Sequence, residues 1–142
     1  MSHRIALALL TVVAAAAAGC GGNGGDDDAS LTRVTWGWQA SSYSNDTEAT
    51  PGDPARYTVE FMDDGSVAIK ADCNQVQGTY TDDGSALTVQ LGPFTKAACP
   101  PDSLDTEFLR DLAAAGTYAL DTDSLRIDLT LDSGSMQLAP AS

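Results

Sequence analysis

The chain has 142 residues, a length that fits one domain, and a formal net charge of −13 from 7 basic and 20 acidic side chains. A chain this acidic lacks the basic face that nucleic acid or an anionic lipid surface requires. Neither is therefore expected as an electrostatic partner. The single histidine, His3, lies in a segment that we expect to be removed. The mature protein would then contain no histidine, which excludes Ser–His–Asp catalysis, Cys–His catalysis and histidine-bound metals. We therefore expect no enzyme activity, no catalytic residue, no metal and no cofactor.

Residues 1–19 have the layout of a secretory signal peptide. Arg4 precedes an apolar run at residues 5–18, which is shorter than the about 20 apolar residues of a membrane-spanning helix. The tetrad Ala17-Ala18-Gly19-Cys20 that follows resembles a bacterial lipobox. This resemblance implies cleavage before Cys20 and acylation of that cysteine, with palmitate among the chains, which would anchor the protein outside the cytoplasm in the cell envelope. The alternative is ordinary cleavage near Ala18, which would leave Cys20 as a free thiol.

Residues 20–30 are rich in glycine and aspartate and cannot support a packed core. We expect them to form a flexible tether between the lipid anchor and a single domain at residues 31–142. The run of Asp26, Asp27 and Asp28 is interpreted as part of this solvated tether rather than as a cation site.

The domain is predicted to be α+β and mainly antiparallel β. Short alternating runs are separated by Asp, Gly and Ser turns, which is typical of a β-meander. A polar loop with two prolines is expected at residues 41–54. In the strand near the C-terminus, Leu125, Ile127, Leu129 and Leu131 are expected to face the core. The clearest strands are expected at residues 31–40, 57–62, 67–71, 78–81, 86–91, 125–131 and 136–139.

One helix is predicted over residues 102–115. Asp102 or Ser103 is expected to cap its first turn, and Gly116 is expected to follow its last turn. About eight short strands and one helix predict a strongly curved, partly open, barrel-like sheet with the helix covering one face. The apolar stripe of the helix is formed by Leu104, Phe108, Leu112 and Ala115.

Three segments, taken in order, resemble the META domain, a family also described as HslJ-like. The first segment, residues 35–41, carries Trp36 at the position of the family's tryptophan. The second segment consists of A-D-C-N at residues 71–74 and G-T-Y at residues 78–80. It is similar to the family's cysteine–asparagine motif, with Asp72 in place of glycine. T-K-A-A-C at residues 95–99 is similar to a further motif, with Ala97 in place of methionine. The resemblance covers nearly all of residues 31–139. The motif residues to which it assigns a structural role are Trp36, Asn74, Gly78, Tyr80 and Thr95.

The resemblance implies a small, mostly antiparallel β fold with one helix, common in secreted proteins and envelope lipoproteins. Members are associated with heat inducibility, antibiotic tolerance and, in parasites, virulence. The family has no defined catalytic residues, so the resemblance assigns none here.

Cys73 and Cys99 are the two cysteines that are left once Cys20 is lipidated. An even pair in an exported domain indicates a disulfide, and the alternative is two buried free thiols. Asn74, beside the first of them, is interpreted as a turn-forming residue, and Tyr80 as a core residue. The acid pairs in the predicted turns lack the ligand spacing of a calcium loop and are interpreted as turn residues; they are Asp63/Asp64, Asp82/Asp83 and Asp121/Asp123.

Trp36 and Trp38 lie two residues apart and therefore share one face of the first strand. We interpret Trp36 as a core residue. Because Gly37 between the two would expose the strand, we predict a partner contact at Trp38.

Together these features predict a lipid-anchored envelope protein with one META-like domain that acts by binding or structural support under stress. The expected partners are the membrane, through Cys20, and an envelope protein. The alternative is a carrier of a small apolar ligand in a cracked β-barrel. A carrier needs an apolar cavity of about 300 Å³ or more, whereas an interaction module needs a filled core and an exposed binding surface.

Overall fold

The computed structural model describes residues 30–141. The predicted signal peptide, the lipid attachment at Cys20 and nearly all of the predicted tether lie outside these residues. No helix in the described part is long and apolar enough to cross a membrane. The elements are β1 (Thr35–Tyr43), β2 (Glu48–Ala49), η1 (Pro54–Arg56), β3 (Tyr57–Phe61), β4 (Ser66–Ala71), β5 (Asn74–Asp82), β6 (Leu87–Leu91), α1 (Asp105–Ala113), β7 (Ala115–Asp121), β8 (Ser124–Leu129), η2 (Thr130–Asp132) and β9 (Gly134–Pro140).

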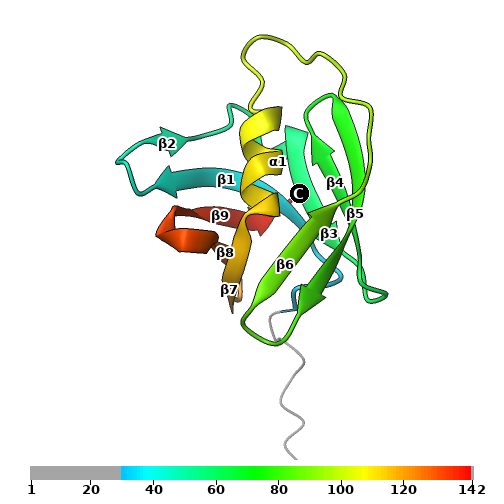
Figure 1. The fold of residues 1–142 in the computed structure, drawn as a ribbon, viewed down its shortest axis with the longest axis vertical. Helices are drawn as coiled ribbons and strands as arrows, with labels where there is room; N and C mark the ends of the chain where they lie inside the picture. The colour runs from blue at the N-terminus through cyan, green and yellow to red at the C-terminus, as the bar shows by residue number, and fades with distance from the viewer. Residues whose placement is uncertain (1–29, 142) are drawn as a thin grey trace, which may run out of the picture.

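The strands form one sheet that curves into a nearly closed barrel (Figure 1). Neighbouring strands run antiparallel in the order β6-β5-β4-β3-β1-β9-β8-β7, and β2 pairs with β1 beside this path. The two ends of the sheet meet at a bridge between Ala86 and Thr117, where the Tyr118 amide donates to the Ser85 carbonyl at 2.8 Å. The prediction of a mainly antiparallel, partly open barrel with one helix is therefore confirmed.

Asp and Gly build the hairpin turns as their local chemistry predicts. Asp64 accepts hydrogen bonds from the Ser66 amide at 2.9 Å and from the Ser66 hydroxyl at 2.6 Å. Gly65 between them has a φ of +85°, in the left-handed region that glycine enters without strain. Asp83 accepts from the Ala86 amide at 2.8 Å. These hydrogen bonds lower the pKa of Asp64 and of Asp83, because they stabilise the charged carboxylates.

Helix α1 lies across the opening of the barrel and packs against β4 and β6 (Figure 1). Phe108 and Leu112, in its apolar stripe, are completely buried. The Phe108 ring stacks on Trp38 with 5.2 Å between centroids, and Tyr57 meets both rings edge-on at 5.6 and 5.8 Å. Three aromatic rings therefore fill the space between the helix and the sheet.

Strand β1 is longer than predicted, and its inward face changes along its length. It continues into a two-stranded arm with β2, so the prediction of an irregular loop throughout residues 41–54 is wrong. The register against β9 shifts just after Trp38, which marks a β-bulge and reverses the alternation of side chains. Trp36, Trp38 and then Ser41 are consequently all buried.

Both ends of α1 differ from the prediction. Leu104, rather than Asp102 or Ser103, occupies the N-cap position. The predicted capping of the first turn is nevertheless met in part, because the Ser103 hydroxyl accepts a hydrogen bond from the Asp105 amide at 3.3 Å. Gly116 does not end the helix; it lies in β7, at a register shift against β8. The chain passes from Ala114 directly into β7, so the connection needs no terminating glycine.

Leu131, predicted to face the core, is 97% exposed. Strand β8 ends at Leu129, before the alternating pattern does. Leu131 and Asp132 then both adopt left-handed φ values, of 59° and 51°, in the turn that leads into β9. The geometry of this turn, rather than the strand pattern, decides where the Leu131 side chain points.

Candidate functional site

Both tryptophans of β1 belong to the core. Trp36 donates its indole N–H to the Leu31 carbonyl at 3.0 Å, and Trp38 donates its indole N–H to the Ser41 hydroxyl at 3.0 Å. Trp38 is 0% exposed and sandwiched by aromatic rings, so a partner cannot reach it in the folded domain. The predicted partner contact at Trp38 is therefore wrong, because Trp36 and Trp38 share the inward face of β1 and the rings of Tyr57 and Phe108 cover Trp38.

The cysteine–asparagine motif links the segment that precedes α1 to the hairpin formed by β4 and β5. A disulfide joins Cys73 and Cys99, whose Cα atoms lie 5.5 Å apart. The buried side chain of Asn74 accepts a hydrogen bond from the Ala97 amide at 2.7 Å and donates one to the Asp105 carboxylate at 3.0 Å. Asn74 therefore cross-links two distant segments; its interpretation as a turn-forming residue is wrong.

The hairpin turn is formed by Asp72 instead. Its φ is +58°, a left-handed value that glycine adopts most readily. Aspartate is one of the few other residues that tolerate this conformation. The carboxylate gains a compensating contact, because Arg56 donates to both of its oxygens at 2.8 and 2.7 Å.

The other motif residues lie apart from one another, Gly78 and Tyr80 in the barrel wall and Thr95 outside it. Gly78 is in β5, where a Cβ atom would clash with the Gln90 carbonyl of the neighbouring strand. Tyr80 is half-buried and packs edge-on against Phe61 with 5.0 Å between ring centroids. Thr95 is exposed in the segment before α1. Gly78 and Tyr80 thus contribute to the packing of the barrel, and the three residues do not converge on one site.

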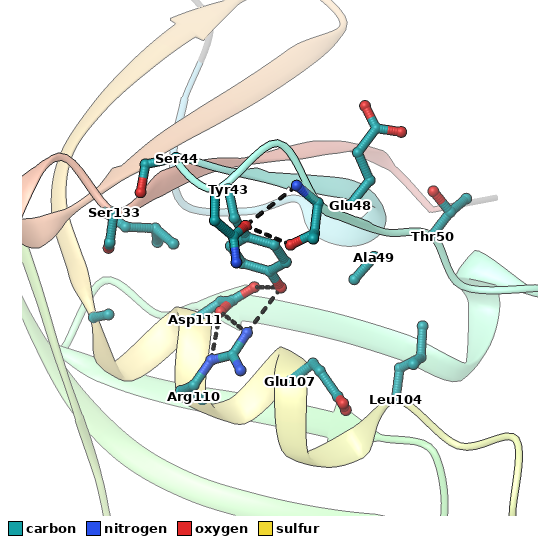
Figure 2. A pocket seen from close by; sticks show the side chains of 14 residues that line it. Tyr43, Ser44, Glu48, Ala49, Thr50, Leu104, Glu107, Arg110, Asp111 and Ser133 are labelled. Carbon is teal, nitrogen blue, oxygen red and sulfur yellow. Dashed lines mark hydrogen bonds and ion pairs between the residues drawn. The ribbon is translucent and has the colours of Figure 1, made fainter.

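A surface cleft of about 790 Å³ separates the β1–β2 arm from α1 (Figure 2). Figure 2 shows the arm on one side of the cleft and the helix on the other, with the Tyr43 side chain between them. Its lining combines hydroxyl, amide and charged groups with a few apolar side chains. The lining residues are Tyr43, Ser44, Asn45, Thr47, Glu48, Ala49 and Thr50 from the arm and its flank, Leu104, Glu107, Arg110, Asp111 and Ala114 from the helix region, and Leu129 and Ser133.

A hydrogen-bonded network of Tyr43, Arg110 and Asp111 joins the arm to the helix. The Tyr43 hydroxyl donates to Asp111 Oδ2 at 2.7 Å, and Arg110 donates to Asp111 Oδ1 through Nε at 3.1 Å and Nη2 at 2.9 Å. The guanidinium carbon lies 5.1 Å from the Tyr43 ring centroid, within cation–π range. Because the Asp111 side chain is only 1% exposed, these donors compensate for the loss of its hydration.

The network keeps Tyr43 protonated. Burial and the hydrogen bond to Asp111 raise the pKa of Tyr43 to about 12. Its hydroxyl therefore stays a hydrogen-bond donor even at pH values near 10, and both oxygens of Asp111 already accept hydrogen bonds. With its charged groups paired in this way, the network is suited to fixing the shape of the cleft rather than to transferring protons.

Sequence reasoning did not single out Tyr43, Arg110 or Asp111. Tyr43 and Asp111 are 68 residues apart, so their contact depends on the tertiary fold. One signal was present: Asp111 lies three residues after Phe108 and therefore beside the apolar stripe of the helix, where a carboxylate needs a buried partner.

The fold and the cleft define a class of small β-barrel domain, with a helix over its opening and, on its surface, a cleft of the size of a ligand site. Residues 29–141 match the model of the META domain, and the chain belongs to the META domain family. No curated protein matches the sequence.

Two solved structures share the fold. A DUF4847 family protein from Bacteroides vulgatus is 16% identical, with a TM-score of 0.61 over 77% of this chain and 93% of the other. A protein from Burkholderia xenovorans is 17% identical, with a TM-score of 0.61 over 79% of this chain and 84% of the other. At these identities, the likeness concerns the fold alone.

Proposed function

We propose that this protein is a non-catalytic binding module, held in the cell envelope by a lipid on Cys20. Its META domain binds a partner in the cleft between the β1–β2 arm and α1. The observation that carries this proposal is the cleft itself, whose volume of about 790 Å³ lies within the about 300–1,000 Å³ typical of ligand sites. Its walls are held in place by the hydrogen-bonded network of Tyr43, Arg110 and the buried Asp111.

The filled interior argues against the alternative of an apolar carrier. Trp38, Tyr57 and Phe108 occupy the space below the helix with centroid distances of 5.2–5.8 Å. All three side chains are at most 2% exposed. An apolar ligand would have to displace this aromatic cluster, whereas a ligand in the surface cleft displaces only water.

The cleft is also well placed for a tethered protein. The chain enters the domain at Leu31, whose carbonyl accepts from Trp36 near the start of β1. Tyr43, which lies in the cleft, ends the same nine-residue strand. Eight steps of about 3.3 Å separate Thr35 from Tyr43, or roughly 26 Å along the strand. With the anchor on Cys20, the cleft lies at the end of β1 that is farther from the anchored N-terminal segment. It is therefore accessible to a partner.

Site-specific photo-cross-linking in the native envelope tests the proposal. A photoreactive amino acid replaces Thr50, which is exposed and lines the cleft. The matched control carries it at Thr88, which is exposed on β6 and lies outside the cleft lining. We expect a discrete cross-linked product from position 50 that position 88 does not give. The same products from both positions, or none from position 50, would contradict binding in the cleft.

A further inference from the structure

Strand β2 has an unpaired edge that borders the cleft. In the arm, the Tyr43 amide donates to the Thr47 carbonyl at 2.9 Å, and Ser41 pairs with Ala49 two residues further on. Backbone groups alternate in direction along an antiparallel ladder, so the N–H and C=O of Glu48, between these positions, point away from β1. Neither group has a hydrogen-bond partner among residues 30–141. Such an edge is a ready template for another strand.

The charges around this edge favour a basic ligand. Glu48 and Glu107 both line the cleft, and neither makes an ion pair within the described residues. The only cation in the lining, Arg110, is paired with Asp111 at 2.9 Å. The cleft therefore has an excess of negative charge, in a chain whose net charge is already −13.

We propose that the cleft takes an extended polypeptide segment with basic side chains, which pairs with the free edge of β2. This inference rests on the proposed binding function and names the chemistry of its partner. The segment's backbone bonds the outward N–H and C=O of Glu48, as in other cases of strand addition. Its lysine or arginine side chains lie on the exposed face of β2, beside the Glu48 carboxylate and within the negative charge that Glu107 adds to the cleft. Its apolar side chains lie on the opposite face, with Ala49 and Leu104. Figure 2 shows the Glu48 carboxylate on the side of the arm away from the helix, Ala49 on the side that faces the helix, and Glu107 on the helix itself.

Fluorescence anisotropy with a labelled synthetic peptide of alternating lysine and valine tests the proposal on the full chain in detergent. The critical variant is Glu48→Pro, which removes the outward N–H without touching the ladder to β1. Glu48→Gln is its matched control, because both variants lose the carboxylate. We expect Glu48→Pro to bind at least about fivefold more weakly than Glu48→Gln, as the loss of one backbone hydrogen bond predicts.

A second comparison tests the charge. Glu107→Gln removes a carboxylate of the cleft, and Asp123→Asn removes one from the exposed turn between β7 and β8. We expect weaker peptide binding for Glu107→Gln alone, and no binding of the matched peptide of glutamate and valine. Equal binding by Glu107→Gln and Asp123→Asn would reduce the effect to overall charge and overturn the proposal.

Amide hydrogen exchange keeps the test independent of how well Glu48→Pro folds. In the unmodified chain, the lysine peptide should slow exchange of the Glu48 amide. Failure of the peptide to bind or to protect this amide overturns the inference. If position 50 still cross-links a partner in the envelope, the proposed binding function survives that failure.

Discussion

At the scale of single residues, Trp38 is a structural residue despite its position near a polar arm. Its ring contacts Tyr57 and Phe108, and its indole N–H satisfies the buried hydroxyl of Ser41. Trp38→Ala should therefore destabilise the domain by about 3–5 kcal/mol, as a large truncation in a packed core does. Denaturant unfolding measures this change. Trp36→Ala is the matched comparison and should cost a similar amount; a loss below about 1 kcal/mol for Trp38→Ala alone would place that ring outside the core.

The network in the cleft predicts a dependence of stability on alkaline pH. The pKa of Tyr43 is raised from 10.0 to about 12 by burial and by its bond to Asp111. A raised folded-state pKa means that the stabilisation is complete below pH 10 and is lost as the pH rises towards 12. Tyr43→Phe should lower stability at neutral pH and weaken its decline over this interval.

Denaturant unfolding at a series of pH values measures the effect of Tyr43→Phe. Tyr118 provides a matched comparison outside the cleft, because burial and a hydrogen bond to Asp82 raise its pKa to about 12 as well. Tyr118→Phe should remove a comparable share of the decline without affecting the cleft. A wild-type tyrosinate titration in which all four tyrosines ionise near pH 10 would contradict the network.

At the scale of elements, the disulfide covalently links the irregular segment between β6 and α1 to the β4–β5 hairpin. The double variant Cys73→Ser/Cys99→Ser should lose about 3–4 kcal/mol of stability in the chain-entropy model for a loop of this length. Hydrogen exchange should accelerate first in residues 92–104, which the bond holds against the β4–β5 hairpin. Both cysteines should resist alkylation in the native, unreduced protein; quantitative alkylation would show that the bond is absent.

The elements that the sequence predicted well are those decided by local chemistry. The turn at Asp64 and Gly65 follows from an Asp side chain that bonds the backbone two residues on and from a glycine at positive φ. The apolar stripe through Phe108 and Leu112 also identified the buried face of α1. Both signals lie within a few residues of the feature that they predict.

The elements that were mispredicted depend on distant contacts. The bulge after Trp38 exists in the register between β1 and β9, strands from opposite ends of the domain, and it turns Ser41 inward. The cleft likewise requires Tyr43 and Asp111 to meet across 68 residues of chain. No periodicity along the sequence carries that information, because the pattern within one segment does not specify which strands become its neighbours.

At the scale of the whole molecule, the proposed anchor sets where the barrel operates. Wild-type protein should incorporate labelled palmitate and partition into detergent, because several acyl chains are needed for stable membrane retention. Cys20→Ala should do neither, while the domain unfolds at an unchanged denaturant concentration. Soluble, unlabelled wild-type protein would contradict the lipobox interpretation but leave the cleft untouched.

Hydrogen exchange of the native protein, compared between intact envelope membranes and the purified, detergent-solubilised state, tests binding in the cleft most directly. It reports the whole domain at once, so each region outside the cleft serves as an internal control. We predict slower exchange in the envelope at residues 46–50 and 104–111, which form the two walls, and unchanged exchange in β5 and β6. Equal exchange of both walls in the two states, or protection confined to β5 and β6, would contradict a partner in the cleft.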